Sequence, residues 1–453
     1  MSRCCAYLLH LFLVVVMSAD QHTATRLKGR LTGALPKQMQ SNRPGTWAHD
    51  TMTRRFLAEI FPRILEDNAG ELTQPSHSAN SEALLLLNDL KSSLECGSQG
   101  ILRGLAEKIA PDTATWDRIL REIREEDRNW LDAPWIVSEF YLYRRVVECF
   151  KYFETGYDCF KRQKGNGLVE ALPSIEEIAQ RLPVLLSCED GSRGQAVKVA
   201  ILTSLWGNKM DLSLWPAASA GQQISFGAAL DANAPFILDD HCDTVTKVLT
   251  AGSTPPRGQR CDIIVDNAGY ELVSDMILGH ALLKTGCVDK VVFHTKGHPT
   301  FVSDATTADC TETIGFLRDQ IAERPATAAF ASELAKHVSE GRFVFEEDLF
   351  WCQPTPFWDM PDHVQDKLRN SKMVFVKGDA NYRRLLGERE WPLDTRAADV
   401  LSYWPVPVCA LRTFKAEIGC GVSAAAQQRA QAKDSKWQVS GKWGVVQTQL
   451  EDN

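Results

Sequence analysis

The feature that most constrains the fold is a change of sequence pattern near residue 195. Beyond it, short runs rich in valine and isoleucine are separated by stretches with helical spacing. Strands that alternate with helices over about 200 residues predict a mainly parallel sheet covered on both faces. We therefore expect an α/β chain whose residues 195–453 form a three-layer α/β/α domain. The expected strands are Ala196–Leu202, Ile263–Val265, Lys290–His294, Phe343–Phe345, Met373–Val376 and Val408–Leu411.

The apolar spacing over residues 46–194 is mostly helical, and we expect an all-helical N-terminal region there. Trp47, Phe56, Ile60 and Ile64 follow the rhythm of one helix face. Further helices are expected at Ser81–Leu94, at Pro134–Phe153, where proline occupies the first turn, and at Ser174–Leu186, interrupted at Pro183.

Residues 1–45 are expected to be a leader or targeting segment, or a disordered extension. Residues 3–19 resemble a signal peptide, with Arg3 before a twelve-residue apolar run and Ser18-Ala19 after it. Twelve residues are too few for a membrane-spanning helix, which needs about 20, so no stable membrane span is expected. Residues 21–49 contain five Lys or Arg and no acid, which is typical of an organelle transit segment. A start codon placed too early is the alternative.

Charge and cysteine usage narrow the function classes. The net charge of -8 argues against nucleic acid as the main partner, because neutralising phosphates needs a basic surplus. A small phosphorylated ligand needs only a few converging cations and stays possible. The thirteen cysteines show no CxxC pair and no zinc spacing. Most of them are expected to be buried apolar side chains in a reducing compartment.

Ligands of open α/β sheets bind beyond the carboxyl ends of the strands, so the residues after each expected strand are the candidates. Asp266 and Asn267 end one strand, and Ala268-Gly269 lets the backbone turn into a helix. A carboxylate and an amide oxygen are hard ligands suited to Mg²⁺ or Mn²⁺. The alternative is a turn in which this pair caps the following helix.

The next strand is followed by a loop that ends in Ser303-Asp304. Asp304 is positioned to complete a metal site from the adjacent strand. Alternatively, or in addition, Ser303-Asp304 caps a helix that starts near Thr307.

Two later strands are followed by loops that carry cations. Lys377 and Arg383 follow one strand, and Arg412 and Lys415 follow the last. Gly378 permits close backbone approach, and Asn381 supplies a neutral polar contact. Lys and Arg beside a divalent ion are what a phosphoryl group requires. The alternative is that these charges are solvated and have no role.

Other features carry less weight. Gly419-Cys420-Gly421 lacks the βαβ unit of a nucleotide-binding loop, because few residues follow it. His294 and His298 form no metal-binding spacing and are expected either to be structural or to lie behind the residues that bind the ligand. Tryptophans such as Trp351 are expected to pack in the core or the wall of a pocket.

Four motifs occur in order and carry a resemblance. They are Asp266–Glu271 (DNAGYE), Phe301–Asp304 (FVSD), Lys377–Arg383 (KGDANYR) and Arg412–Lys415 (RTFK). Together they resemble the metal-dependent damage-control phosphatases, in the sugar-phosphate phosphatase subgroup with a C-terminal Arg-Thr-x-Lys motif. That family is also called the acidic-residue or protein-glutamate methyltransferase family. The resemblance runs from about Thr46, through residues 135–145, to residues 441–447.

The resemblance implies a fold and a set of site residues. The fold is a helical N-terminal part with an α/β/α domain, and the compartment is the cytoplasm. Asp266, Asn267 and Asp304 would hold the metal and act in catalysis. The implied substrate-binding residues are Asp266, Asn267, Glu271, Lys377, Asp379, Ala380, Asn381, Tyr382, Arg383, Arg412 and Lys415. Glu271 and Asp304 also match positions linked to a methyl-donor site. Ala380 is a departure, since the family more often has a bulkier apolar residue there.

The implied activity is hydrolysis of sugar phosphates of the fructose 1-phosphate or fructose 6-phosphate type. Manganese or nickel is the implied metal, with cobalt or magnesium as alternatives. The nucleophile is either a metal-activated water or Asp266 itself. The runner-up function is a methyltransferase that uses S-adenosylmethionine to modify protein glutamates. A non-catalytic sugar-phosphate sensor is a third hypothesis.

Overall fold

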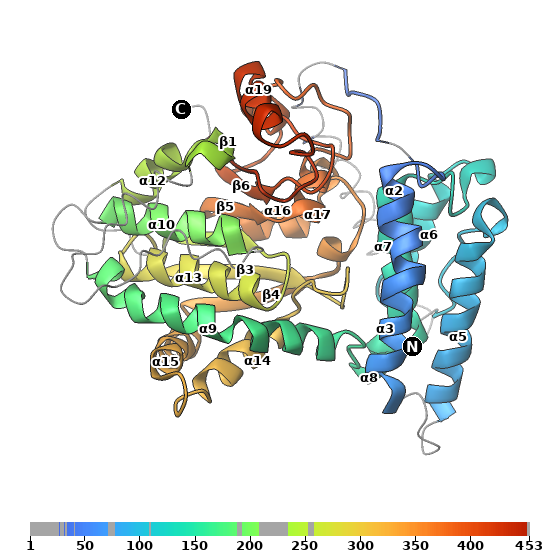
Figure 1. Ribbon diagram of the computed structural model, residues 1–453, viewed down its shortest axis with the longest axis horizontal. Coiled ribbons are helices and arrows are strands. Elements are labelled where there is room, and N and C mark those ends of the chain that lie inside the picture. Colours follow the sequence, from blue (N-terminus) through green and yellow to red (C-terminus); the bar gives the residue numbers. More distant parts are fainter. Residues whose placement is uncertain are drawn as a thin grey trace, which may run out of the picture.

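The computed structural model describes residues 27, 31, 34–39, 41–70, 78–107, 110–187, 193–207, 234–251 and 258–450. A helical N-terminal region stands beside an α/β domain, next to the ends of strands β3 and β4 (Figure 1). The expected leader over residues 1–45 lies largely outside the described residues.

Seven strands of the described chain form one sheet, in the order β1-β7-β6-β5-β2-β3-β4. Five neighbouring strands, from β6 to β4, are parallel, while β7 runs antiparallel to β6, and β1 pairs with β7 in parallel. Their bounds are β1 Ile237–Asp240, β2 Arg260–Ile264, β3 Lys290–Lys296, β4 Phe343–Asp348, β5 Ser371–Lys377, β6 Val408–Thr413 and β7 Gly444–Gln449. The predicted mainly parallel sheet is confirmed.

Two layers of helices cover the sheet, which confirms the predicted three-layer architecture. Strand residues alternate between two cores, as Ile263 packs on one face of the sheet and Ile264 on the other. The first core is covered by α9 Lys161–Leu186, α10 Arg193–Trp206, α12 Cys242–Thr250, α13 Tyr270–Lys284, α14 Thr307–Arg318 and α15 Pro325–Ser339. The second is covered by α16 Asp362–Leu368, α17 Asp379–Leu385, α18 Ala397–Val400 and α19 Ala424–Lys433.

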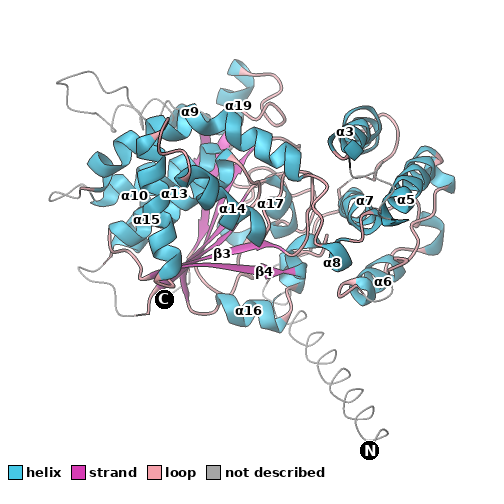
Figure 2. Cartoon of the chain, turned by 90° about the horizontal axis from the view of Figure 1, so that it is seen from below, coloured by secondary structure: helices cyan, strands magenta, loops and turns pink. Residues whose placement is uncertain are grey.

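The N-terminal helices build a third core of their own and stand beyond the ends of strands β3 and β4 rather than on a face of the sheet (Figure 2). They are α2 Trp47–His49, α3 Phe61–Asp67, α5 Ser78–Glu95, α6 Thr113–Arg121, α7 Trp135–Cys149 and α8 Tyr152–Thr155. Two π-helical stretches, Asp50–Arg54 and Phe56–Ile60, join α2 to α3 into one continuous helix. Short 3₁₀ turns lie at Gly97–Gln99, Glu125–Asp127, Ala234–Phe236, Leu349–Cys352 and Phe357–Asp359.

Two predicted elements are wrong in type or extent. The strand expected at Ala196–Leu202 lies inside α10, which is buried on nearly all sides, and an evenly apolar run does not distinguish a buried helix from a buried strand. The helix expected at Ser174–Leu186 is part of the 26-residue α9, which continues through Pro183 without interruption. Burial of Leu182 and Leu185 on either side of this proline offsets the missing backbone donor.

Strands β1 and β7 were not predicted. Strand β7 lies between β1 and β6 but is unusually polar for such a position. Its buried Gln447 is tolerated there because the side-chain amide donates hydrogen bonds to Asp239 and to the Cys420 carbonyl. A hydropathy pattern does not reveal such a strand.

The ten described cysteines are free thiols, and nine of them are buried, which confirms that they are core side chains. The compartment stays a prediction. Among the helices that the structure describes, none is long and apolar enough to cross a bilayer.

Candidate active site

The loops after β2 and β3 lie side by side at the carboxyl ends of these strands. The amide of Ala305 donates to the Asp266 carbonyl at 2.8 Å, and the amide of Ala268 donates to the Ser303 carbonyl at 2.6 Å. A β-bridge also joins Asn267 to Asp304. The backbone therefore brings the three predicted metal ligands together, although they lie 38 residues apart at most.

Both aspartates are almost fully buried, with 6% of Asp266 and 2% of Asp304 exposed. Oδ2 of Asp266 accepts from Nδ2 of Asn267 at 3.0 Å, whereas Oδ1 is buried and has no hydrogen-bond partner. Oδ2 of Asp304 lies 3.1 Å from Nζ of Lys296, a buried lysine at the end of β3 that sequence reasoning missed. Each carboxylate thus keeps unused capacity for a cation.

The pKa values of Asp266 and Asp304 also indicate that a further positive charge would be favourable here. Burial, and then the charges of Asp304 and Glu271, raise the pKa of Asp266 well above its usual range. Burial also raises the pKa of Asp304, although Lys296 acts in the opposite direction. A divalent cation between the two carboxylates would offset the burial that disfavours their charged forms.

The donor set fits a hard metal ion, with two carboxylates and one amide oxygen. No group of three His, Cys, Asp or Glu side chains suited to a metal occurs among the described residues. Any metal at this site would therefore rely on the amide of Asn267 as well as on the carboxylates. The amide is held by its neighbours, since Nδ2 donates to Glu271 at 2.7 Å and Oδ1 accepts from Ser303.

The two capping roles considered for these residues are wrong. Gly269, with φ of 69°, occupies the N-cap of α13 without a side-chain cap, so Asp266 and Asn267 do not cap that helix. At α14 the cap is Thr306, which forms a capping box with Asp309, and not Ser303-Asp304. The polar side chains of both loops are thereby left for the site.

Of the predicted cations, Lys377 lies behind the site rather than in it. Its Nζ donates to the Ser204 carbonyl and lies 3.4 Å from Glu271 and 3.2 Å from Asp275. Asn381 is also fully buried, and its Nδ2 donates to the carbonyls of Val265 and Lys377. These residues tie β2 to β5 and support Glu271.

Arg412 and Arg383 are likewise held by the protein. Arg412 donates through Nε to Asp379 at 2.7 Å, and its guanidinium lies 4.6 Å from the ring centre of Tyr382. Burial alone would raise the pKa of Asp379, but Arg412 and then Arg383 lower it overall. The hydroxyl of Tyr382 donates to Gln447 at 2.7 Å.

Arg383 forms a two-point ion pair with Glu388, and its guanidinium lies 3.9 Å from the ring centre of Trp135. Lys415 differs from these arginines. It is exposed, and it makes no hydrogen bond or ion pair with the described residues.

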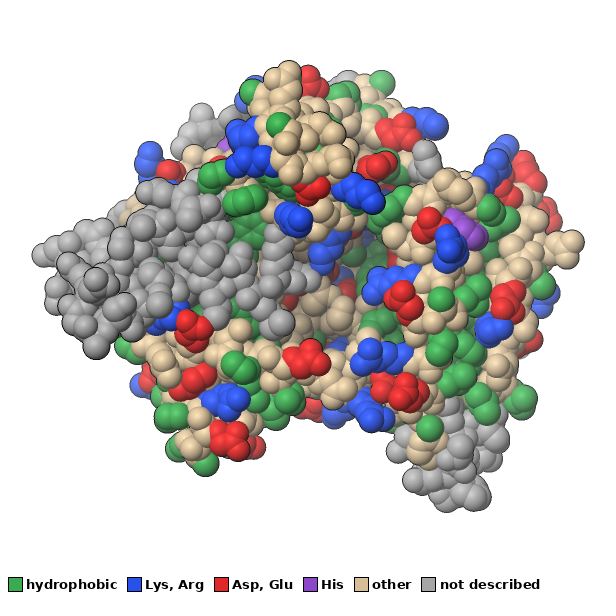
Figure 3. Space-filling view, in the orientation of Figure 1, with side chains coloured by type: hydrophobic (Ala, Val, Ile, Leu, Met, Phe, Trp, Pro, Cys, Tyr) green, Lys and Arg blue, Asp and Glu red, His purple; other side chains and the backbone are tan. Residues whose placement is uncertain are grey.

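A cavity of about 540 Å³ joins these groups to the N-terminal helices. Figure 3 shows the surface hollowed between the two parts of the molecule. From the α/β domain the cavity is lined by Gly207, Asp266, Asn267, Ala268, Tyr270, Glu271, Phe301, Ser303, Asp304, Asp379, Ala380 and Lys415. From the N-terminal helices it is lined by Trp47, Thr51, Arg55, Trp135 and Glu139. The second group has no motif of its own, although its segments belong to the region of family resemblance.

The loop that carries Asp304 is anchored to those helices by Phe301. The Phe301 ring packs edge-on against Phe140 at 4.5 Å and Tyr143 at 5.1 Å. Phe301 and Val302 have φ of 48° and 70°, a region that a β-branched residue rarely adopts. Such strain persists only where the surrounding packing holds it, and it is common at functional sites.

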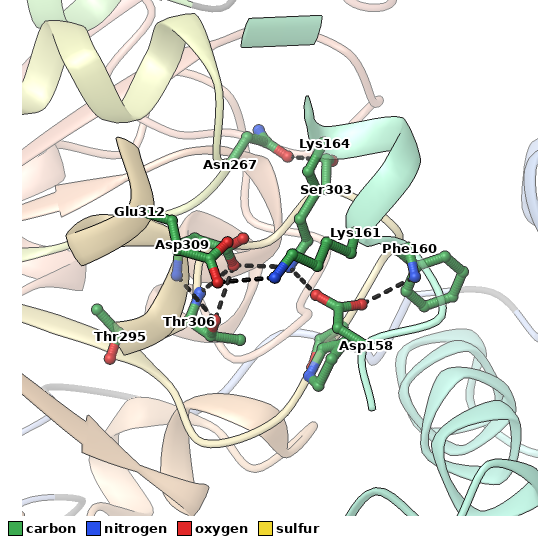
Figure 4. Close-up of polar contacts among 12 residues, drawn as sticks. Asp158, Phe160, Lys161, Lys164, Asn267, Thr295, Ser303, Thr306, Asp309 and Glu312 are labelled. Carbon is green, nitrogen blue, oxygen red and sulfur yellow. Dashed lines mark hydrogen bonds and ion pairs between the residues drawn. The ribbon is translucent and has the colours of Figure 1, made fainter. Parts of the chain in front are cut away.

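A buried lysine makes a second link between the two parts (Figure 4). Nζ of Lys164, in the first turn of α9, donates to Asp158 at 2.9 Å and to Asp309 at 2.7 Å. Asp309 is the residue that forms the capping box with Thr306. The start of α14, directly after the Asp304 loop, is thereby fixed to the start of α9.

Comparison with known proteins shows what the chain is similar to. The sequence model of the damage-control phosphatase ARMT1-like domain matches residues 57–430. Damage-control phosphatase ARMT1 of Xenopus tropicalis is 31% identical over 91% of this chain and 98% of its own length. The Danio rerio protein of that name is 30% identical over 92% and 97%, and the human one is 30% identical over 88% and 91%. A crystal structure of a DUF89 family protein from Pyrococcus horikoshii aligns with a TM-score of 0.38 and 12% identity, over 81% of this chain and 97% of that one.

Proposed function

The chain belongs to the ARMT1-like damage-control phosphatase family, and from this premise we propose that it is a metal-dependent phosphomonoesterase acting on sugar phosphates. The fructose 1-phosphate and fructose 6-phosphate type is the proposed substrate. One observation carries the proposal beyond the family name. Asp266 presents a buried oxygen without a partner in a cavity that also contains Asp304 and the unpaired cation of Lys415.

Asp266, Asn267 and Asp304 are proposed to hold the metal, with manganese or nickel preferred and cobalt or magnesium as alternatives. A divalent ion bound there would neutralise phosphate charge and act as a Lewis acid. Lys296 already balances part of the charge of Asp304, so Asp266 gains most from the added cation.

Lys415 is proposed to bind the phosphoryl group, because it lines the cavity and, unlike Arg55, has no ion pair with any residue that the structure describes. Arg412 and Arg383 act indirectly in this proposal. Arg412 orients Asp379 beside Ala380 at the cavity, and Arg383 is stacked behind the wall formed by Trp135. Fixed charges of this kind need no reorganisation when charge develops on the phosphoryl oxygens.

The test is a phosphate-release assay on fructose 1-phosphate and fructose 6-phosphate with Mn²⁺, Ni²⁺, Co²⁺ or Mg²⁺. We expect release that stops on chelation and falls at least about 100-fold in Asp266→Asn and Asp304→Asn. Asp366→Asn is the matched control, because Asp366 is 64% exposed on α16 and its one ion pair among the described residues is with Arg369. Full activity in Asp266→Asn would refute the site assignment.

The same assay separates the other hypotheses. A methyltransferase would transfer methyl groups from S-adenosylmethionine with or without the metal, and a sensor would bind sugar phosphate without turnover. Of the glycines discounted earlier, Gly419 packs on the Phe414 ring and Gly421 lies beside Asp239 and Gln447. These contacts do not favour a methyl-donor loop there.

A further inference from the structure

The cavity is larger than a phosphate group needs, and one of its walls comes from the N-terminal helices. This wall consists of Trp47, Thr51, Arg55, Trp135 and Glu139. The rings of Trp47 and Trp135 lie 5.3 Å apart between centroids, tilted by 55°. Indole faces favour the C–H surface of a carbon chain over a phosphate.

Glu139 is the unusual member of this wall. It lies in the second turn of α7, lines the cavity and is only 8% exposed. It makes no hydrogen bond and no ion pair with any described residue, although all other buried glutamates of the described chain have such partners. Its carboxyl group therefore has access only to the cavity, where a hydrogen bond to a bound molecule would compensate for its removal from bulk water.

The charges around Glu139 decide which form of the carboxyl is present. Of the nearby cations, Arg383 lowers the pKa of Glu139 most, but it is already paired with Glu388. Arg55, the second, lies at the exposed rim near Glu59. Asp379 and Glu388 add negative charge. Burial outweighs the two arginines and raises the pKa of Glu139 to about 8. At neutral pH the group is a neutral acid, which both donates and accepts a hydrogen bond.

This chemistry suits an alcohol. A phosphate would need a cation, and a metal ion would need a carboxylate, whereas a neutral carboxyl pairs well with a hydroxyl group. Apolar indoles beside one neutral donor and acceptor are the arrangement expected for a hydroxylated carbon chain.

We propose that Glu139, flanked by Trp47 and Trp135, binds a hydroxyl group of the substrate and selects phosphomonoesters of polyhydroxylated carbon chains. The inference rests on the proposed phosphatase function and assigns its specificity to the N-terminal helices. Glu139 is then a binding residue for the part of the substrate that is not hydrolysed.

The test compares two phosphomonoesters, fructose 1-phosphate and phenyl phosphate, the second of which has no alcohol groups. Glu139→Leu removes the hydrogen bond, and we expect the ratio of kcat/KM for the sugar to that for phenyl phosphate to fall about 10-fold, mainly through KM. Glu139→Gln keeps a donor and an acceptor and should keep the ratio within about 3-fold of wild type. Glu122→Leu, at a 67% exposed position beside α6, is the control for folding.

A pH series gives a second measurement that needs no leucine variant. Above pH 8 Glu139 ionises, so the wild-type ratio should fall while that of Glu139→Gln stays level. The groups that face it, Arg383, Arg55, Asp379, Glu388 and Tyr143, are common to both proteins. An equal loss for both substrates, an unchanged ratio in Glu139→Leu, or parallel pH profiles would each overturn the inference. If wild type released phosphate from neither ester, the proposed function itself would fail instead.

Discussion

A β-carbon at Gly378 would lie 1.9 Å from Oδ2 of Asp266. The backbone after β5 therefore touches the carboxylate that follows β2, and Gly378 has φ of 82°, a value that side chains rarely tolerate. Close approach of one strand end to a candidate metal ligand makes this glycine part of the site.

Gly378→Ala should displace Asp266 and lower kcat by about 100-fold, because a shift near 1 Å at a reacting group has that effect. Its free energy of unfolding should fall by about 1–3 kcal/mol from the strained φ. Gly315→Ala is the control, since Gly315 lies in helix α14 with nothing within 4 Å of the added carbon. That variant should keep full activity and gain up to about 1 kcal/mol of stability. Normal phosphate release by Gly378→Ala would contradict the assignment of Asp266.

Metal binding should stabilise the protein measurably. At about 100 times its Kd, a metal that binds only the folded state adds about 2.7 kcal/mol. Thermal unfolding with Mn²⁺ should therefore show a raised Tm that returns to the starting value with chelator. In Asp304→Asn the shift should be much smaller, whereas Asp366→Asn should behave as wild type. An equal shift in all three proteins would place the metal elsewhere.

Lys415→Met should raise KM for sugar phosphates by about 10-fold or more, because it removes the unpaired lysine that lines the cavity. Stability should change little, since Lys415 is exposed and has no ion pair within the described part of the chain. Lys442→Met, at another exposed lysine, is the matched control. Steady-state kinetics on both variants measure this effect. Equal KM values for Lys415→Met and Lys442→Met would show that Lys415 does not bind the phosphate.

Because of Glu139, the free energy of unfolding should decrease as the pH rises from 5 to 8. The folded protein keeps this proton up to about pH 8, whereas an unfolded chain loses it near pH 4.3, so folding takes up a proton between these values. The free energy of unfolding of wild type should therefore fall, relative to Glu139→Gln, by a few kcal/mol from pH 5 to pH 8. Above about pH 9 the difference should stay constant. Urea titrations across this range measure it, and parallel curves would show that Glu139 is not buried as described.

Lys164→Met should destabilise the protein by about 3 kcal/mol, because it leaves the half-buried Asp158 and Asp309, whose side chains are 14% and 12% exposed, without the buried cation that they share. Lys161→Met is a close control three residues away, where the ion pair with Glu312 is exposed and worth less than about 1 kcal/mol. Both are compared by urea unfolding. Equal losses in the two variants would show that Lys164 does not link α9 to α14.

Much of the site follows from sequence order because of a general property of parallel sheets. Asp266 and Asp304 each come after a strand, and neighbouring parallel strands deliver such residues to one edge. Residues from all four motifs line one cavity, as this property leads one to expect. The same reasoning expected four converging cations, but Lys377, Arg383 and Arg412 are each paired with an acid on the protein. A sequence shows that a charge is near a site, but not which partner it already has.

The sequence by itself determined the alternation of strands and helices, the order of the motifs and the family, because these depend on local periodicity and on residues close together along the chain. Only the tertiary structure decided that α10 is a helix, that Lys296 reaches Asp304, and that the N-terminal helices close the cavity with Glu139 and Trp135. The physical reason is that burial and pairing are properties of contacts between distant segments. Glu139 lies more than 100 residues before Asp266, and its neutral carboxyl is a consequence of the packing around it.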